Sequence, residues 1–138
     1  MVTVIMGLKG SGKTKQMIDM INRASQTEHG DIIAIERGQK LDTEVHARTA
    51  RLIEMKAYDV RSYQVLRGFI TGLYAGNYDI THIFIDSLLK IAHCDEMGEL
   101  ERFLDWMDRF GEANNITFTV SVSADVSAAT DKIKSYFL

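Results

Sequence analysis

The chain has 138 residues, of which 46% are hydrophobic and 25% charged, so it is long enough for one globular domain with a buried core and too short for two. Its net charge of −3 argues against a general nucleic-acid binder, which usually presents a basic face, while leaving room for a local basic patch. Cys94 is the only cysteine, which excludes an internal disulfide or a cysteine cage for a metal and suits a reducing compartment.

The N-terminal apolar run, residues 2–6, is rich in β-branched side chains and stops at Gly7, which predicts a short buried strand. This run is too short for the core of a signal peptide, and no run reaches the ~20 apolar residues that span a bilayer, so we expect a cytoplasmic protein with no membrane partner. Residues 12–28 then predict a helix, because their apolar side chains recur at spacings of three and four. Gly30 is expected to end this helix as a C-cap glycine.

The middle of the chain combines two clear elements with a segment that fits none. Residues 31–36 predict a second buried strand, and residues 62–75 predict a helix with one apolar face. Between them, residues 37–49 are polar and indicate no regular element, whereas residues 51–55 fit a short extra strand.

The C-terminal half continues the alternation of strand and helix. Residues 83–86 (Ile-Phe-Ile-Asp) predict a buried strand, residues 96–113 a long amphipathic helix, residues 116–124 a strand with a period of two, and residues 127–137 a terminal helix. Buried apolar strands separated by helices predict an α/β fold, a three-layer sandwich in which a mainly parallel sheet carries helices on both faces.

Four residues follow the ends of predicted strands: Gly7, at the start of a glycine-rich segment, and three carboxylates, Glu36, Asp86 and Asp125. Right-handed crossovers bring the carboxyl ends of parallel strands to one edge of the sheet, where ligands bind in open α/β folds. We therefore expect these four positions to lie near a common site.

The segment between the first strand and the first helix matches the pattern G-x-x-x-x-G-K-[ST] at every fixed position. It reads Gly7, Leu8, Lys9, Gly10, Ser11, Gly12, Lys13, Thr14. Glycines let successive backbone N–H groups approach triphosphate oxygens closely, and the helix that starts there adds its positive end. Lys13 is expected to reach the β- and γ-phosphates, and the Thr14 hydroxyl to ligate Mg²⁺. The alternative is a plain glycine turn with an exposed lysine, which the strand–loop–helix context disfavours.

On these residues the chain resembles the P-loop NTPase superfamily, in its RecA-like and thymidine-kinase-like branch, where the carboxylate strand comes later in the chain than the loop. The specific motifs cover residues 7–14 and 83–86, and the architecture covers most of the chain. The resemblance implies one nucleotide-binding domain over residues 1–138, with ATP or GTP and Mg²⁺ as its ligands. Partition-type ATPases carry a second loop lysine at the position of Leu8, so we interpret Lys9 as an ordinary loop residue.

Asp86 looks like the carboxylate that ends a Walker B strand and holds Mg²⁺ opposite the phosphate loop. The alternative is that Asp86 caps a helix starting at Ser87. Many related ATPases and thymidine kinases carry a glutamate base where this chain has Ser87, so the base for hydrolysis is not evident from the motif. Glu36 is a candidate substitute for that base, and its alternative interpretation is a solvated charge beside Arg37.

Two further sets of polar residues could have a role. Ser123 or Asp125, at the end of the last strand, is a candidate sensor of the γ-phosphate, and Asp125 is equally a candidate cap for the last helix. The spacing of His82, His93, Cys94 and Asp95 fits no zinc pattern, so His93 and Cys94 are expected to border the core or the surface.

Three functions remain open. The first is Mg²⁺-dependent binding of a nucleoside triphosphate, with ATP preferred, and slow or partner-stimulated hydrolysis that drives a conformational switch. An arginine finger would then come from a second subunit or a protein partner. The second is a small-molecule, nucleoside-type kinase, for which residues 37–59 are the only candidate acceptor pocket. The third is a binding module that does not hydrolyse its nucleotide, which the missing glutamate favours. Nothing in the sequence gives a strong nucleic-acid signal.

Overall fold

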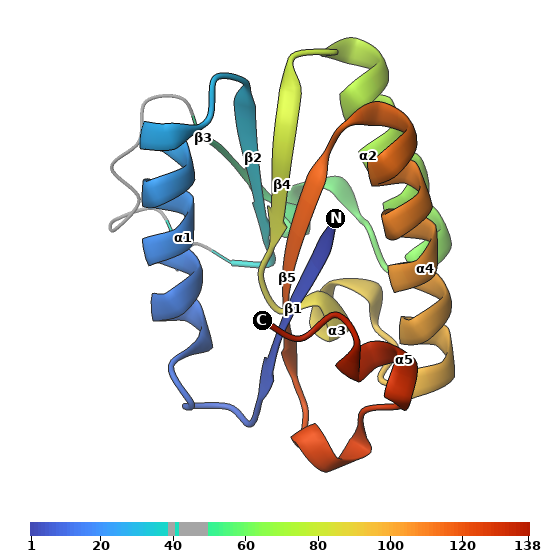
Figure 1. The fold of residues 1–138 in the computed structure, drawn as a ribbon. Coiled ribbons are helices and arrows are strands. Elements are labelled where there is room, and N and C mark those ends of the chain that lie inside the picture. Colours follow the sequence, from blue (N-terminus) through green and yellow to red (C-terminus); the bar gives the residue numbers. More distant parts are fainter. Residues whose placement is uncertain (39–40, 42–49) are drawn as a thin grey trace.

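The computed structural model describes residues 1–38, 41 and 50–138. Within these residues, one sheet has the strand order β1-β5-β4-β2-β3, and every pairing in it is parallel (Figure 1). Its strands are β1 (Val2–Gly7), β2 (Asp31–Glu36), β3 (Ala50–Glu54), β4 (Ile80–Ile85) and β5 (Thr117–Ser123). The last strand in the sequence thus lies between β1 and β4, and all carboxyl ends meet at one edge.

Helices cover both faces of the sheet. Figure 1 shows α1 (Lys13–Thr27) on one face, and α2 (Tyr63–Gly76) and α4 (Met97–Asn114) on the other. The shorter elements are α3 (Leu88–Ala92), α5 (Asp131–Lys134) and two 3₁₀ turns, η1 (Met55–Tyr58) and η2 (Val126–Ala128). The expected three-layer α/β sandwich is confirmed. None of the helices in the described ranges has the length and apolarity that crossing a membrane requires.

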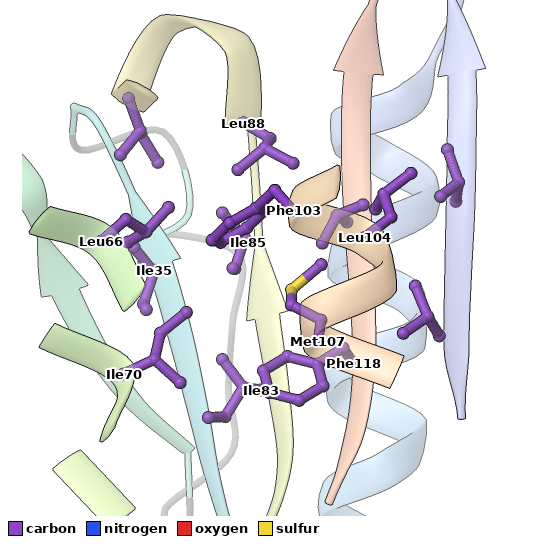
Figure 2. Close-up of a cluster of buried hydrophobic side chains, with 14 of the residues drawn as sticks. Ile35, Leu66, Ile70, Ile83, Ile85, Leu88, Phe103, Leu104, Met107 and Phe118 are labelled. Atoms are coloured by element: carbon purple, nitrogen blue, oxygen red, sulfur yellow. The ribbon is translucent and has the colours of Figure 1, made fainter. Parts of the chain in front are cut away.

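The hydrophobic core is divided by the sheet, because neighbouring strand residues point to opposite faces. Ile83 and Ile85 of β4 belong to the larger part, under α2 and α4, whereas Phe84 between them belongs to the smaller part, under α1. Figure 2 shows the larger part, with Ile35, Leu66, Ile70, Leu88, Phe103, Leu104, Met107 and Phe118 gathered around the two isoleucines. Burial on both faces explains why the strands are continuous apolar runs.

The expected role of Gly30 as a C-cap is wrong. Helix α1 ends at Thr27, and its C-cap residue is Glu28, which has an extended conformation and donates its backbone N–H to the carbonyl of Ala24 at 2.8 Å. Gly30 does not have a positive φ; instead, a Cβ atom there would collide with the side chain of Thr81 and lie 2.6 Å from the carbonyl oxygen of Asp79. Glycine is needed at this position for close packing and not for a left-handed turn.

The terminal helix predicted over residues 127–137 is also wrong in extent. The chain makes the turn η2 and then only four residues of α5, whose first turn is capped by the Thr130 hydroxyl. It then runs alongside the open edge of β1. There the backbone N–H of Val4 donates to the carbonyl of Tyr136 at 2.8 Å, and Phe137 forms an isolated parallel β-bridge with Val4. Pairing with the unsatisfied backbone groups of an edge strand replaces continuation of the helix.

The other boundaries agree with prediction to within a few residues. The short extra strand expected over residues 51–55 is confirmed as β3, which pairs with β2. Most of the polar segment that indicated no regular element, residues 39–40 and 42–49, lies outside the described residues.

His82 is buried in the sheet, near the end of β4 that is remote from Asp86. Its Nδ1 lies 2.7 Å from Glu28 Oε2, its Nε2 lies 2.9 Å from Thr119 Oγ1, and its ring stacks on Phe84. Burial lowers the pKa of His82, and the hydrogen bond and charge of Glu28 oppose that shift without cancelling it. His82 therefore serves the packing of α1 on the sheet.

This burial predicts a loss of stability in mild acid. The unfolded chain binds a proton at His82 near pH 6.5, whereas the folded protein resists it, so stability should fall as the pH drops through that value. The contribution is at most about 1.4 kcal/mol per pH unit. Urea unfolding at pH 7.5 and pH 5.5 should show a smaller loss for His82→Gln than for the wild type. An equal loss in the two proteins would mean that folding does not lower the pKa of His82.

Candidate nucleotide-binding site

Residues 7–14 make the turn that joins β1 to α1, and three glycines shape it. Gly10 and Gly12 both have a φ of +87°, a conformation that strains any other residue. At Gly7 a Cβ atom would lie 2.7 Å from Ser11 Oγ, so the loop closes on itself there. Helix α1 begins directly afterwards, and its first N–H groups have no carbonyl partner within the helix. Such a geometry suits the binding of an anion.

Lys13 is folded back beneath this loop. It is only 8% exposed, and its Nζ donates to the carbonyl oxygen of Leu8 at 2.8 Å and to Ser11 Oγ at 3.4 Å. Burial lowers the pKa of Lys13, the Asp86 carboxylate opposes that shift, and the charge of Lys90 adds to it. An ammonium held by a neutral carbonyl would gain a stronger, charge-assisted hydrogen bond from a phosphate oxygen.

Asp86 follows β4 and lies opposite the loop. It is 3% exposed; its Oδ1 accepts from Ser121 Oγ at 2.6 Å and its Oδ2 from Thr14 Oγ1 at 3.4 Å. Asp86 does not cap a helix, because the N-cap position of α3 is Ser87 and no side chain caps it. The fold thus brings the two predicted Mg²⁺ ligands, Thr14 and Asp86, into contact across 72 positions of sequence.

Ser121 is the site residue that the sequence interpretation missed. Its hydroxyl donates to Asp86 and accepts the backbone N–H of Ser87 at 2.8 Å, so it fixes both the carboxylate and the turn after β4. Ser87 itself has a φ of +59°, which is unusual for a residue other than glycine. The available signal was a serine inside an apolar strand, on the same face as Ser123 by the period of two.

Glu36 ends β2, the neighbour of β4, and is 2% exposed. The Asp86 backbone N–H donates to the carbonyl of Ile35 at 2.9 Å, which places Glu36 beside Asp86 at the sheet edge. Its Oε1 accepts the backbone N–H of Leu41 at 3.2 Å. The alternative interpretation of Glu36 as a solvated charge is therefore wrong. Both carboxylates border a cavity of about 160 Å³.

The two candidate sensor residues differ in position. Ser123 is half-buried and pairs in register with Gly7, so it lies beside the start of the loop. Asp125 is exposed, and its Oδ1 accepts the backbone N–H of Ser127 at 2.9 Å; these hydrogen bonds lower the pKa of Asp125. Asp125 thus caps η2, whereas the last helix is capped by Thr130.

The oxygen atoms of Thr14 and Asp86 suit Mg²⁺, which prefers hard ligands and is usually held by one or two protein groups together with substrate phosphates. Among the described residues, no group of three or more histidine, cysteine, aspartate or glutamate side chains could hold a metal by itself. A bound phosphate chain and water can supply the remaining ligands of a Mg²⁺ ion at this site.

These features define an α/β protein with a glycine loop, a buried lysine and a carboxylate at one sheet edge. No family model and no curated protein matches the chain. Among solved structures, its fold is similar to that of a KaiC-like protein from the hyperthermophilic archaeon Pyrococcus horikoshii OT3, with a TM-score of 0.67 and 14% sequence identity. The match covers 98% of this chain and 66% of the KaiC-like protein, so this chain spans about two thirds of the length of that protein. At 14% sequence identity, this structural similarity is evidence for the fold alone.

Proposed function

We propose that the protein binds the Mg²⁺ complex of a nucleoside triphosphate, ATP or GTP, at residues 7–14. The observation that carries the proposal is the contact of the Thr14 hydroxyl with the buried Asp86 carboxylate, 3.4 Å apart, beside a loop with two left-handed glycines. A hydroxyl and a carboxylate at this spacing suit one metal ion, and the loop suits the phosphates that share it. The similarity of fold to a KaiC-like protein supports the same proposal.

Each residue then has a distinct role. The loop N–H groups and the start of α1 bind phosphate oxygens. Lys13 leaves the carbonyl of Leu8 for the β- and γ-phosphates, and Ser121 holds Asp86 in the orientation that faces Thr14. Mg²⁺, when bound, neutralises charge on the phosphate chain. Ser123 would sense the γ-phosphate, and its pairing in register with Gly7 supports this role.

Hydrolysis by the isolated protein should be slow, because Ser87 stands where related ATPases have a glutamate. Among the residues that the structure describes, Glu36 is the candidate base beside Asp86, and an arginine finger would come from a second subunit or a partner. We therefore expect phosphate release well below ~0.1 s⁻¹. Glu36→Gln should lower that residual rate and leave nucleotide affinity nearly intact. Turnover of several per second, unchanged in Glu36→Gln, would show that another group is the base.

A phosphotransferase is the second candidate, and the cavity between Glu36 and Asp86 favours it. An acceptor hydroxyl in that cavity would attack the γ-phosphorus, the bond to the β–γ bridging oxygen would break, and Glu36 would take the hydroxyl proton. Phosphate release measured with and without small nucleosides separates the two candidates. Consumption of ATP without release of inorganic phosphate indicates transfer.

A further inference from the structure

A second cavity adjoins the one between Glu36 and Asp86. The two have volumes of about 140 and 160 Å³, and Arg37, Lys56 and Lys90 line both. Together they approach the ~300 Å³ at which ligand pockets begin. We call this space the basic cavity, defined by those three residues. It lies over the ends of β4, β2 and β3, and it adjoins the phosphate loop at Asp86, which contacts Thr14.

The charges in the basic cavity are unusual for this chain. The protein as a whole carries a net charge of −3, yet three cations from separate elements converge here, one after β2, one in η1 and one in α3. Within the described residues, no ion pair involves Arg37, Lys56 or Lys90. Arg61, in the second cavity, is by contrast paired with Asp59 at 2.7 Å.

Like charges placed together repel unless an anion lies between them. Arginine supplies a planar fork of donors and lysine a point charge, the combination that binds phosphate oxygens well. Glu36 and Asp86 border one side of the cavity, so its cations also face carboxylates that would orient a ligand with hydroxyl groups. A nucleic-acid backbone would instead need a row of cations along an open face.

We propose that the basic cavity is a second binding site, for the phosphate monoester group of a small molecule, beside the triphosphate site and separate from it. Binding there needs no nucleotide, so this inference goes beyond the proposed function and does not depend on it. If the protein is a phosphotransferase, the same cavity defines its acceptor as a phosphorylated compound. Arg37 and Lys56 bind the phosphate group, and Lys90 completes the cationic wall.

The test is a titration followed by amide chemical shifts in NMR, with inorganic phosphate and then ribose 5-phosphate, and with ribose as the uncharged comparison. It uses Lys13→Ala protein, in which phosphate binding at the loop is weakened. We expect saturable shifts centred on residues 37, 56 and 90, from both phosphates and not from ribose. Adding Lys56→Ala should weaken binding by about tenfold or more, the scale of a lost charged hydrogen bond. Lys134→Ala, an exposed lysine on α5, should change nothing.

Three results would overturn the proposal. One is the absence of saturable phosphate binding in Lys13→Ala protein, which assigns any wild-type binding to the loop. Another is equal affinity with and without Lys56→Ala, given that thermal unfolding shows both proteins folded. The third is binding of a single-stranded oligonucleotide with no response to either small phosphate. Failure of the triphosphate proposal is separate, because it appears as absent Mg²⁺-ATP binding in wild-type protein whatever the cavity binds.

Discussion

Lys13→Ala should abolish most of the stabilisation that a Mg²⁺-nucleotide gives the wild-type protein. A ligand at 100 times its Kd adds about 2.7 kcal/mol to the free energy of unfolding. For a chain of this size, that raises the melting temperature by roughly 6–10 °C. The alanine variant keeps the loop amides but loses the buried ammonium that lies beneath them, 2.8 Å from the Leu8 carbonyl. Differential scanning calorimetry with and without saturating Mg²⁺-ATP or Mg²⁺-GTP measures the effect.

The matched control is Lys15→Ala, which removes the same charge from an exposed position of α1. It should keep the full nucleotide-induced rise. The melting temperature of each protein without nucleotide must also be measured, because Lys13 itself contributes hydrogen bonds to the loop. A full rise in Lys13→Ala, or an equal loss in both variants, would contradict a specific role for Lys13.

Asp86→Asn is expected to shift the Mg²⁺ requirement by about 10- to 100-fold, the range found when groups that support a metal are removed. Asparagine keeps the shape of the side chain and can still accept from Ser121, so the fold should survive while the charge that attracts the cation is lost. Nucleotide affinity without Mg²⁺ should change much less, because the loop and Lys13 remain. Titration of Mg²⁺ at fixed nucleotide, with melting temperature as the readout, gives the midpoint.

Ser121→Ala provides a graded comparison for this experiment. Loss of the Ser121 hydroxyl removes the 2.6 Å hydrogen bond that orients Asp86, whereas the Asp86 carboxylate itself remains. We expect a shift in the same direction as Asp86→Asn and smaller in size. If Asp86→Asn keeps the wild-type Mg²⁺ midpoint, Asp86 is not a metal ligand and its role is confined to the structure of the turn after β4.

The parts of the site that could be predicted from the sequence are those formed by contiguous sequence motifs. The spacing of Gly7, Gly12, Lys13 and Thr14 indicates a loop whose shape depends on local backbone conformation, and the apolar run before Asp86 indicates a strand end. The parallel sheet then brings the two segments to one edge, because all its strands point the same way. Local pattern and general topology together sufficed to expect the contact of Thr14 with Asp86.

The remaining features depend on contacts between distant segments. The hydrogen bond of Ser121 to Asp86 exists because β5 inserts between β1 and β4, and no local pattern specifies that order. Burial of Glu36 depends on Leu41 and on β4 beside it. The basic cavity combines residues from three elements, so its charges are scattered in the sequence and converge only in the fold.

The most direct test of the central claim is a calorimetric titration of the wild-type protein with ATP and with GTP, each with and without Mg²⁺. The account predicts saturable binding of at least one triphosphate, with one site per chain, an affinity that Mg²⁺ increases and a large loss of that affinity in Lys13→Ala. The absence of both binding heat and a melting-temperature shift, at millimolar concentrations of each Mg²⁺-nucleotide, would contradict the claim that residues 7–14 are a nucleotide site.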